Sequence, residues 1–366
     1  MTAYTWLVVF LLVAAVLLKG NLRHNRAFII TAFILLFAII GLRDVYAIGS
    51  DASGSRGSYP NIFNNIGVTE WGSLSGRGEN NFNIGFAYLT KALYIITNGN
   101  YQLYVSLISL FVMISYMRFV ERYSPAPIQS LLCFLGLLYY SFVFDALKQA
   151  LAMSVLLYAF DAIIEKRPIR FITLTAIAAL LHFPALVFLP AYWIGRMKIG
   201  RKYIALLAAL LVLTFVFRDQ LLNIMLNAYS GGESSVTLAG VRFLRNKVLL
   251  MIAITALAVI IKPPSSEDSV YNALLMFAGV AIIFQTFCGY NNTFERLADY
   301  YFHTSIILIP MIFDKDVTEG LLADTQNNRQ VLDYASFLIC AFAVWRFLSY
   351  MNNAGIFNSY QFFWQR

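Results

Sequence analysis

Long apolar runs, separated by short polar segments, dominate the chain from one end to the other. A helix that crosses the hydrocarbon core of a bilayer needs about 20 mostly apolar residues. The pattern therefore predicts an all-α, polytopic membrane helix bundle with about 12 transmembrane helices, in a range of roughly 10 to 14. The expected spans are 4–18, 27–42, 101–119, 128–143, 146–164, 169–183, 185–195, 203–217, 243–261, 271–288, 301–313 and 333–350.

Basic segments between these runs predict the sidedness, because cytoplasmic loops carry an excess of Lys and Arg. Alternation then places these segments inside: Lys19–Arg26, Arg118–Arg122, Glu165–Arg170, Arg196–Lys202, Lys262 and the cytoplasmic loop 314–332. This alternation requires that the apolar stretch Ile84–Thr97 does not cross the membrane. Residues 83–98 are therefore expected to form an in-plane or re-entrant helix on the outer face.

Two long polar loops are expected on the outer face, within a single transmembrane domain of residues 1–366. Residues 43–82 are rich in Gly, Ser and Asn, and residues 218–242 contain the break Gly231-Gly232. Long loops with little structure of their own are usually functional or disordered.

Composition supports the membrane class, because 60% of the 366 residues are hydrophobic and 13% are charged. The net charge of +8 lies largely in short loops, where it sets topology, so nucleic acid is not expected as a partner. Cys133, Cys288 and Cys340 have no metal-binding spacing, and disulfides are not expected. Tyr4–Leu18 has no basic residue before it, which predicts an uncleaved span with its N-terminus outside.

Polar groups at the span ends are the candidate functional residues, because a charge close to lipid is costly and rarely serves packing alone. The topology above would gather them in one polar cavity that opens to the outside. They are Arg43, Asp44, Asp51, Tyr59, Lys148, Gln149, His182, Arg242, Arg245, Glu295, Arg296 and Tyr300.

Their side chains suit the handling of a phosphorylated sugar. Arginine donates bidentately to phosphate, and an imidazole with an ordinary pKa near 6.5 suits a general base. Structural alternatives remain open: Arg43 could snorkel, Asp145 and Lys148 could form an i,i+3 pair, and His182 could pack in the core. Arg242 and Arg245 could equally contact anionic lipid.

Several sequence motifs, in one order along the chain, resemble the EpsG-like group of bacterial polysaccharide polymerases, the Wzy-type enzymes. These motifs are Gly41-Leu42-Arg43-Asp44 with Asp51 and Tyr59, Lys148-Gln149-Ala150-Leu151-Ala152, Glu165-Lys166-Arg167-Pro168, Ala178-Ala179-Leu180-Leu181-His182-Phe183-Pro184-Ala185-Leu186, and Glu295-Arg296 to Tyr300, running on to Ile309-Pro310. Lys148 stands where the group usually has Arg, and Asn83-Ile84-Gly85-Phe86 replaces an expected acidic-Pro element.

The resemblance implies a GT-C-like bundle in the bacterial cytoplasmic membrane with its active site facing the exterior. A growing glycan would pass from undecaprenyl pyrophosphate to the non-reducing end of a lipid-linked repeat unit, yielding O-antigen, capsule or exopolysaccharide. The residue roles are a hypothesis from side-chain chemistry, on which alone Arg242 and Arg245 rest: Arg296 and Lys148, helped by Arg43 or Arg242, would neutralise the pyrophosphate, and His182 or Asp44 would take the acceptor proton. The remaining candidates would bind substrate.

Undecaprenyl-pyrophosphate-linked oligosaccharides and membrane lipid are the implied partners, and no metal or cofactor is expected. The sequence does not decide whether a chain-length regulator binds the internal loop Asp314–Arg329. Three other functions fit the same pattern: another polyprenyl-linked membrane glycosyltransferase, an O-antigen-type ligase, and a lipid-linked oligosaccharide flippase or transporter. A transporter would spread its polar groups through the membrane and carry inverted repeats, whereas here they gather at one face.

Overall fold

The computed structural model describes residues 2–17, 26–49, 58–76, 83–197, 201–217, 219–220, 246–261, 268–288, 292–314, 326–353 and 360–365. Regular structure within these ranges is helical, and Arg43 and Phe362 form an isolated antiparallel bridge. The candidates Asp51, Arg242 and Arg245 lie outside the described residues, as does nearly all of the expected loop 218–242.

Three helices in the described part of the chain are both long and apolar enough to cross a bilayer. They are α5 (Tyr101–Tyr123), α8 (Leu147–Ile164) and α17 (Gln326–Asn353), whose apolar part begins at Gln330. Shorter apolar helices surround them: α1 (Ala3–Leu17), α2 (Arg26–Gly41), α4 (Ile84–Ile96), α6 (Pro127–Gly136), α9 (Pro168–Leu181), α11 (Arg201–Val216), α13 (Asn246–Ile261) and α14 (Ser269–Gln285). The protein is therefore an all-helical, membrane-integral protein.

The remaining helices are short or polar. They are α3 (Tyr59–Val68), α7 (Phe142–Asp145), α10 (Ala191–Ile194), α15 (Asn292–Phe302) and α16 (Ser305–Ile312), with the 3-10 helices η1 (Trp71–Gly76), η3 (Phe183–Phe188) and η4 (Phe363–Gln365). The expected outer loop 43–82 thus contains α3 and η1, and α17 begins inside the expected loop 314–332.

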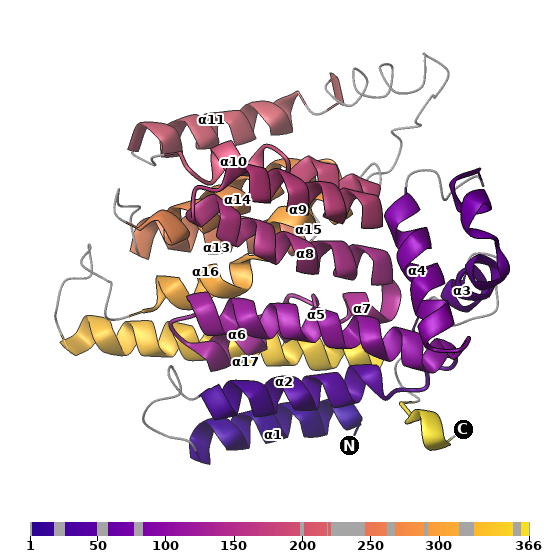
Figure 1. Ribbon diagram of the computed structural model, residues 1–366. Coiled ribbons are helices and arrows are strands. Elements are labelled where there is room, and N and C mark those ends of the chain that lie inside the picture. Colours follow the sequence, from indigo (N-terminus) through magenta and orange to yellow (C-terminus); the bar gives the residue numbers. More distant parts are fainter. Residues whose placement is uncertain are drawn as a thin grey trace.

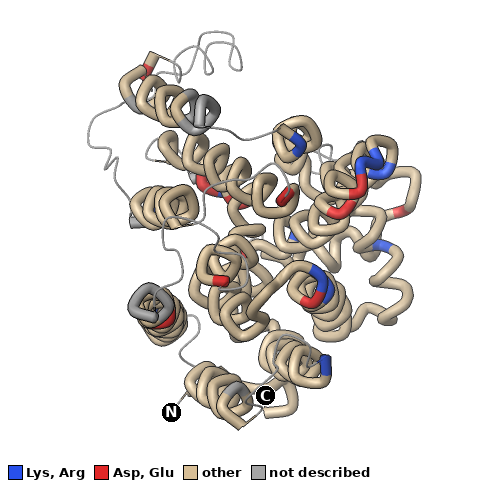
Figure 2. Tube along the Cα trace, turned by 90° about the vertical axis from the view of Figure 1, so that its left-hand side faces the viewer, with Lys and Arg blue, Asp and Glu red and all other residues tan. Residues whose placement is uncertain are grey.

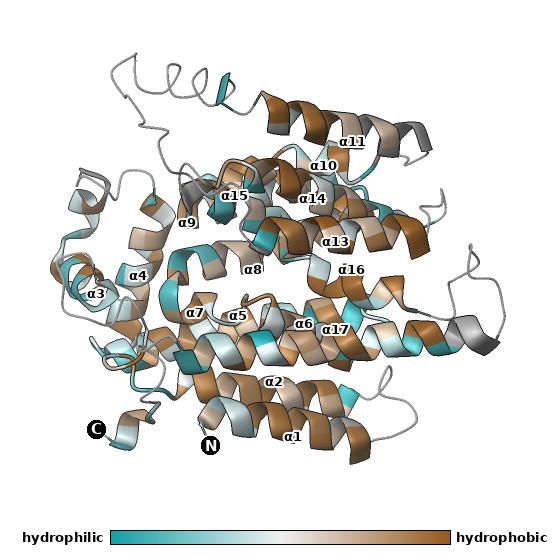
Figure 3. Cartoon of the chain, turned by 180° about the vertical axis from the view of Figure 1, so that it is seen from behind, coloured by the Kyte–Doolittle hydropathy of each residue, from teal (hydrophilic) through white to brown (hydrophobic). Residues whose placement is uncertain are grey.

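Most apolar helices lie side by side in a stack that runs from α1 and α2 at one edge to α11 at the other (Figure 1). Helices α3 and α4 stand at one end of this stack, and α4 runs across the direction of the long helices. Both chain termini lie at the same end, which we call the α4 end. Figure 3 shows hydrophilic segments in α15 and around α3, next to mainly hydrophobic long helices.

Three of the expected spans are broken rather than continuous helices, which corrects the prediction from hydropathy. Residues 128–143 divide into α6 and α7 because Leu138 has a φ of 68°, which a right-handed helix cannot continue. Residues 301–313 divide between α15 and α16, and residues 185–195 fall in η3 and α10. Pro184 and Pro190, at the starts of η3 and α10, lack the N–H of a regular helix.

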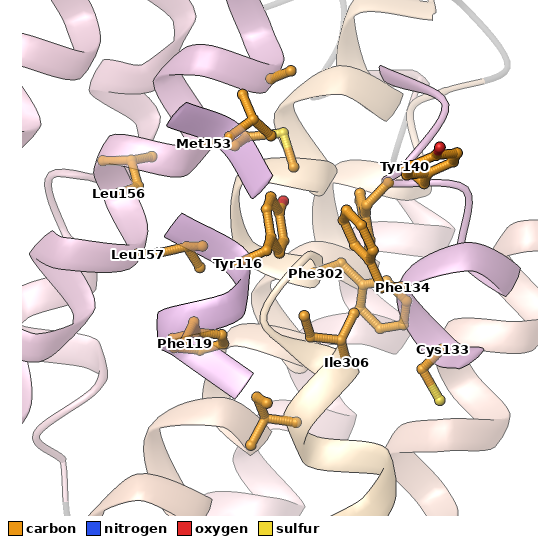
Figure 4. Packing of buried hydrophobic residues seen from close by; sticks show 14 of the residues in the cluster. Tyr116, Phe119, Cys133, Phe134, Tyr140, Met153, Leu156, Leu157, Phe302 and Ile306 are labelled. Atoms are coloured by element: carbon orange, nitrogen blue, oxygen red, sulfur yellow. The ribbon is translucent and has the colours of Figure 1, made fainter. Parts of the chain in front are cut away.

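Helix α8 forms the centre of the bundle, and 83% of its 18 residues are buried. Figure 4 shows its residues Met153 and Leu157 in one buried cluster with Tyr116 of α5, Phe134 of α6 and Phe302 of α15. Lipid tails are as apolar as these side chains, so close packing rather than a hydrophobic driving force holds such helices together. The aromatic rings of Tyr116 and Phe134 lie 4.4 Å apart by centroid.

An ion-pair network joins α5, α8 and α9 at the end of the stack opposite α4. Asp161 is fully buried, pairs with Arg118 at 2.6 Å and accepts a hydrogen bond from the Tyr123 hydroxyl at 2.7 Å. Glu165 pairs with Arg122 at 2.8 Å and also with Arg170. Figure 2 shows this end, with acidic and basic positions next to one another along the chain. The basic segments around residues 118–122 and 165–170 thus share one end of the protein.

Candidate functional site

Six of the candidate residues come together at the α4 end, although they are distant in the sequence. Their elements are α3, the start of α8, the link between α9 and η3, and α15. We call this group the His182 cluster; it consists of Tyr59, Lys148, Gln149, His182, Arg296 and Tyr300.

His182 and Tyr300 form the direct contact between α9 and α15. The Nδ1 atom of His182 is hydrogen-bonded to the Tyr300 hydroxyl, and the two ring centroids lie 6.1 Å apart. His182 follows the last residue of α9 and has an extended backbone, which turns its side chain away from the helix. Tyr300 is fully buried, so its position is set by packing. The link between two apolar helices thus presents an imidazole to α15.

Gln149 ties α8 to the same helix. Its Nε2 donates to the backbone carbonyl of Arg296 at 3.0 Å, and its side chain is buried. Its Oε1 has no hydrogen-bond partner among the described residues, which leaves a buried acceptor beside Arg296. The Arg296 side chain is exposed, and the described part of the chain provides no hydrogen bond or ion pair for it. An exposed cation therefore lies beside a buried amide oxygen that has no partner among the described residues.

Lys148 is held between aromatic rings of α3 and α4. Its Nζ lies 5.9 Å from the ring centroid of Tyr59 and 5.1 Å from that of Phe86, distances at which a cation is attracted to a ring face. The Lys148 backbone N–H also donates to the Tyr59 hydroxyl at 3.3 Å. Because Asp145 ends α7 and Lys148 lies in α8, the two are not in one continuous helix. The sequence pattern did not indicate Phe86.

The positive charges of the cluster change the pKa of His182, which lies between α9 and η3 and belongs to neither helix. Burial, followed by the positive charges of Lys148 and Arg296, lowers the pKa of His182 from 6.5 to about 4. The imidazole is therefore neutral at pH 7 and can accept a proton. This places two cations close to one potential base.

Helix α4 supports the His182 link through Asn83 and Gly85. The Asn83 side-chain oxygen accepts a hydrogen bond from the Phe183 backbone N–H at 3.0 Å. A Cβ on Gly85 would lie 2.7 Å from the Leu180 Cβ and 3.0 Å from its carbonyl carbon and oxygen. The replacement of the expected acidic-Pro element by Asn83-Ile84-Gly85-Phe86 thus brings α4 into close contact with the end of α9.

Gly85→Ala is expected to destabilise the protein by about 1–3 kcal/mol, the usual cost of overpacking, and to lower activity by displacing α4. Thermal unfolding of the purified protein in detergent measures the first effect. Gly72→Ala is the matched control, because a Cβ on Gly72 meets nothing within 4 Å. Equal unfolding temperatures for the two variants would contradict this role of Gly85.

Arg43 and Asp44 are not part of the His182 cluster, because their side chains are buried in contacts with other elements of the fold. Arg43 is 3% exposed, donates to the Val143 carbonyl at 3.1 Å and lies 4.4 Å from the Phe144 ring centroid. Asp44 is 2% exposed and accepts hydrogen bonds from the Tyr46 backbone N–H at 2.9 Å and the Gln361 side chain at 3.0 Å. Both residues therefore fasten the end of α2 to its neighbours and are shielded from solvent.

A second polar group consists of Glu295 and three residues that were not among the candidates, Lys247, Asp299 and Tyr139. Lys247, at the start of α13, has its Nζ 2.8 Å from Asp299 and 3.2 Å from Glu295. The Tyr139 hydroxyl donates to Asp299 at 3.1 Å. The sequence contained a signal for Asp299, since it follows Glu295 by four residues and shares its helix face.

Comparison with known proteins identifies the family. The EpsG family matches residues 26–363, a range that includes every residue of the His182 cluster. No curated protein and no solved structure matches the chain. The resemblance noted in the sequence motifs is thus confirmed over nearly the whole chain. The protein belongs to the EpsG family, which marks it as a membrane protein of the polysaccharide-polymerase kind.

Proposed function

We propose that the protein polymerises a polysaccharide on the outer face of the bacterial cytoplasmic membrane. The donor is a growing glycan on undecaprenyl pyrophosphate, and the acceptor is the non-reducing end of a lipid-linked repeat unit. The observation that carries this proposal is the contact of the His182 imidazole with the Tyr300 hydroxyl, with the cations Lys148 and Arg296 close by.

In the proposed transfer, an acceptor hydroxyl oxygen attacks the anomeric carbon of the donor sugar. The bond from that carbon to the pyrophosphate oxygen breaks, and its electrons leave with the pyrophosphate. The hydroxyl proton passes to His182. Asp44 is less suited to this step, because hydrogen bonds already occupy both of its carboxylate oxygens.

Arg296 and Lys148 stabilise the leaving group in this scheme. Fixed cations aimed at developing negative charge are commonly the largest contribution to such catalysis. The exposed guanidinium of Arg296 can bind phosphate oxygens bidentately, whereas Lys148 supplies a point charge between two rings. Gln149 keeps its predicted role in substrate binding, in which its buried Oε1 would gain a partner.

Tyr300 acts as a positioning residue for His182. If Nε2 is to accept the proton, Nδ1 must carry the ring hydrogen and donate it to the Tyr300 hydroxyl oxygen. The observed contact at Nδ1 suits this arrangement. Tyr300 thereby holds the orientation of the base and can accept the hydrogen that Nδ1 carries in this tautomer.

The proposed topology has about 12 passes in a GT-C-like bundle. Residues 43–82, 83–98 and 218–242 lie outside, and residues 314–332 lie in the cytoplasm. Asp51, Arg242 and Arg245 keep their predicted roles in substrate binding, and Glu295 acts there through its contact with Lys247. O-antigen, capsule and exopolysaccharide are all products compatible with this chemistry.

The proposed function is tested by the glycan of a deletion strain, separated by size on a gel. Single repeat units without the gene and a ladder after complementation are expected for a polymerase. Loss of all surface glycan, with lipid-linked units trapped inside, would indicate a flippase. Long glycan that accumulates on its lipid carrier would indicate a ligase.

The acid limb of the pH–rate profile is expected to move to higher pH in Lys148→Met. The positive charge of Lys148 disfavours the protonated ring of His182, so removing this charge raises the pKa of His182. The neutral base is lost as the pH falls through that pKa, so kcat/KM falls at a higher pH. Initial rates with lipid-linked repeat units in membrane vesicles measure this. The control is Arg167→Ala, which removes an exposed charge at the opposite end and should leave the acid limb of the profile at the same pH. An acid limb that does not move in Lys148→Met would refute the coupling between Lys148 and His182.

A further inference from the structure

Helix α15 carries polar side chains on two different faces. Arg296 and Tyr300 are one turn apart and belong to the His182 cluster. Glu295, Asp299 and His303 follow one another at intervals of four residues, which places them along another stripe, with His303 just beyond the helix end. The identity of the residues that reach His182 therefore depends on the rotation of α15 about its axis.

The second stripe is anchored from α13 and from the segment after α6. Lys247 has its Nζ within 2.8 and 3.0 Å of the two Asp299 carboxylate oxygens, and the Tyr139 hydroxyl lies 3.1 Å from one of them. Asp299 is 1% exposed. Separating a buried carboxylate from its cation strongly destabilises a protein. The rotation of α15 that keeps Asp299 in contact with Lys247 is therefore strongly preferred.

We propose that Lys247 and Asp299, with Tyr139, are positioning residues for the transfer reaction: their contact fixes the rotation of α15 that aims Tyr300 at His182 and keeps Arg296 beside it. The effect of this contact on catalysis rests on the proposed function. A helix turns by about 100° per residue, so even part of that rotation would carry Tyr300 out of reach of the imidazole.

The same chain contains a natural comparison for this pair. Asp161 in α8 is also a buried carboxylate that contacts a tyrosine hydroxyl and a basic side chain, Tyr123 and Arg118. It lies 12 residues beyond Gln149 on the same helix, which is roughly 18 Å along the axis. A variant at Asp161 therefore removes a similar interaction without a direct effect on α15.

The rotation of α15 can be measured without any assay of activity. The His182 and Tyr300 ring centroids lie 6.1 Å apart, so the rate at which a short bis-maleimide links cysteines at these two positions reports whether the positions still approach one another. The measurement uses His182→Cys with Tyr300→Cys in a chain whose Cys133, Cys288 and Cys340 are alanine. This background lacks the His182–Tyr300 hydrogen bond, so the cross-linking rate reports on the remaining anchors of α15. Mass spectrometry of the linked peptides gives the rate.

Asp299→Asn and Lys247→Met are expected to slow cross-linking by at least about tenfold, Tyr139→Phe by less, and Lys247→Arg hardly at all. Asp161→Asn should leave the rate unchanged. Unchanged cross-linking in Asp299→Asn and Lys247→Met would overturn the proposal. If Asp299→Asn fails to fold, Lys247→Met against Lys247→Arg gives the same comparison.

The catalytic consequence is measured separately, in chains that keep His182 and Tyr300. Lys247→Met should lower kcat with little change in KM, and Lys247→Arg should restore it. Normal kcat in Lys247→Met, together with slowed cross-linking, would refute the link to catalysis. If the wild-type chain makes no polymer, the proposed function fails, while the cross-linking result still decides the positioning of α15.

Discussion

Replacing Arg296 with alanine is expected to leave single repeat units on the cell surface and to lower the polymerisation rate by roughly 10²- to 10³-fold. The guanidinium is exposed beside the buried Gln149 side chain, where a pyrophosphate can reach it. In the proposed mechanism, its loss removes the bidentate donor that stabilises the pyrophosphate as the bond to the anomeric carbon breaks. The glycan ladder of a complemented deletion strain, resolved on a gel, is the measurement.

The matched control for this prediction is Arg167→Ala, whose side chain is 64% exposed at the opposite end of the bundle. It should preserve the full ladder. Arg296→Lys is expected to recover part of the activity, because it restores charge but not the bidentate geometry. Normal polymerisation by both Arg296→Ala and Lys148→Ala would show that neither cation handles the leaving group.

His182→Gln is expected to lower kcat by roughly 10²- to 10⁴-fold, the usual contribution of a general base, with little effect on substrate binding. Glutamine keeps a polar side chain of similar size but cannot take the acceptor proton. Tyr300→Phe removes only the hydrogen bond at Nδ1, so a smaller loss is expected. Initial rates with purified protein and lipid-linked repeat units separate the effects on kcat and KM.

His24→Gln is the control for the histidine series; His24 lies outside the described residues. This variant should retain the wild-type rate. A His182→Gln protein that is folded and polymerises at the wild-type rate would exclude His182 as the base. The proton would then have to pass to another group of the cluster or to solvent.

Much of the His182 cluster follows from the sequence alone. Lys148 and Arg296 lie at the ends of apolar spans and His182 lies inside one, and the cost of a charged or polar group near lipid marks them as functional candidates. The same apolar runs predicted the all-helical membrane class and the helices α5 and α8. These features are local, because hydropathy and helical period depend on neighbouring residues.

The tertiary structure decided features that depend on residues far apart in the chain. Hydropathy could not predict the chain break at Leu138, because Leu138 lies within an apolar run. Phe86 joins Lys148 only when α4 packs beside α8. Such contacts result from how helices stack, which no local pattern specifies.

The sequence by itself thus determined that the protein is a helical membrane protein of this family, and which polar residues are candidates for its chemistry. Only the tertiary structure decided their tasks. It engages Asp44 with Gln361, 317 positions away, and pairs Lys247 with Asp299, while it directs Tyr300 to His182. The physical reason is that the cost of burying a polar group can be read from its local surroundings, whereas the partner that offsets this cost is supplied by the fold.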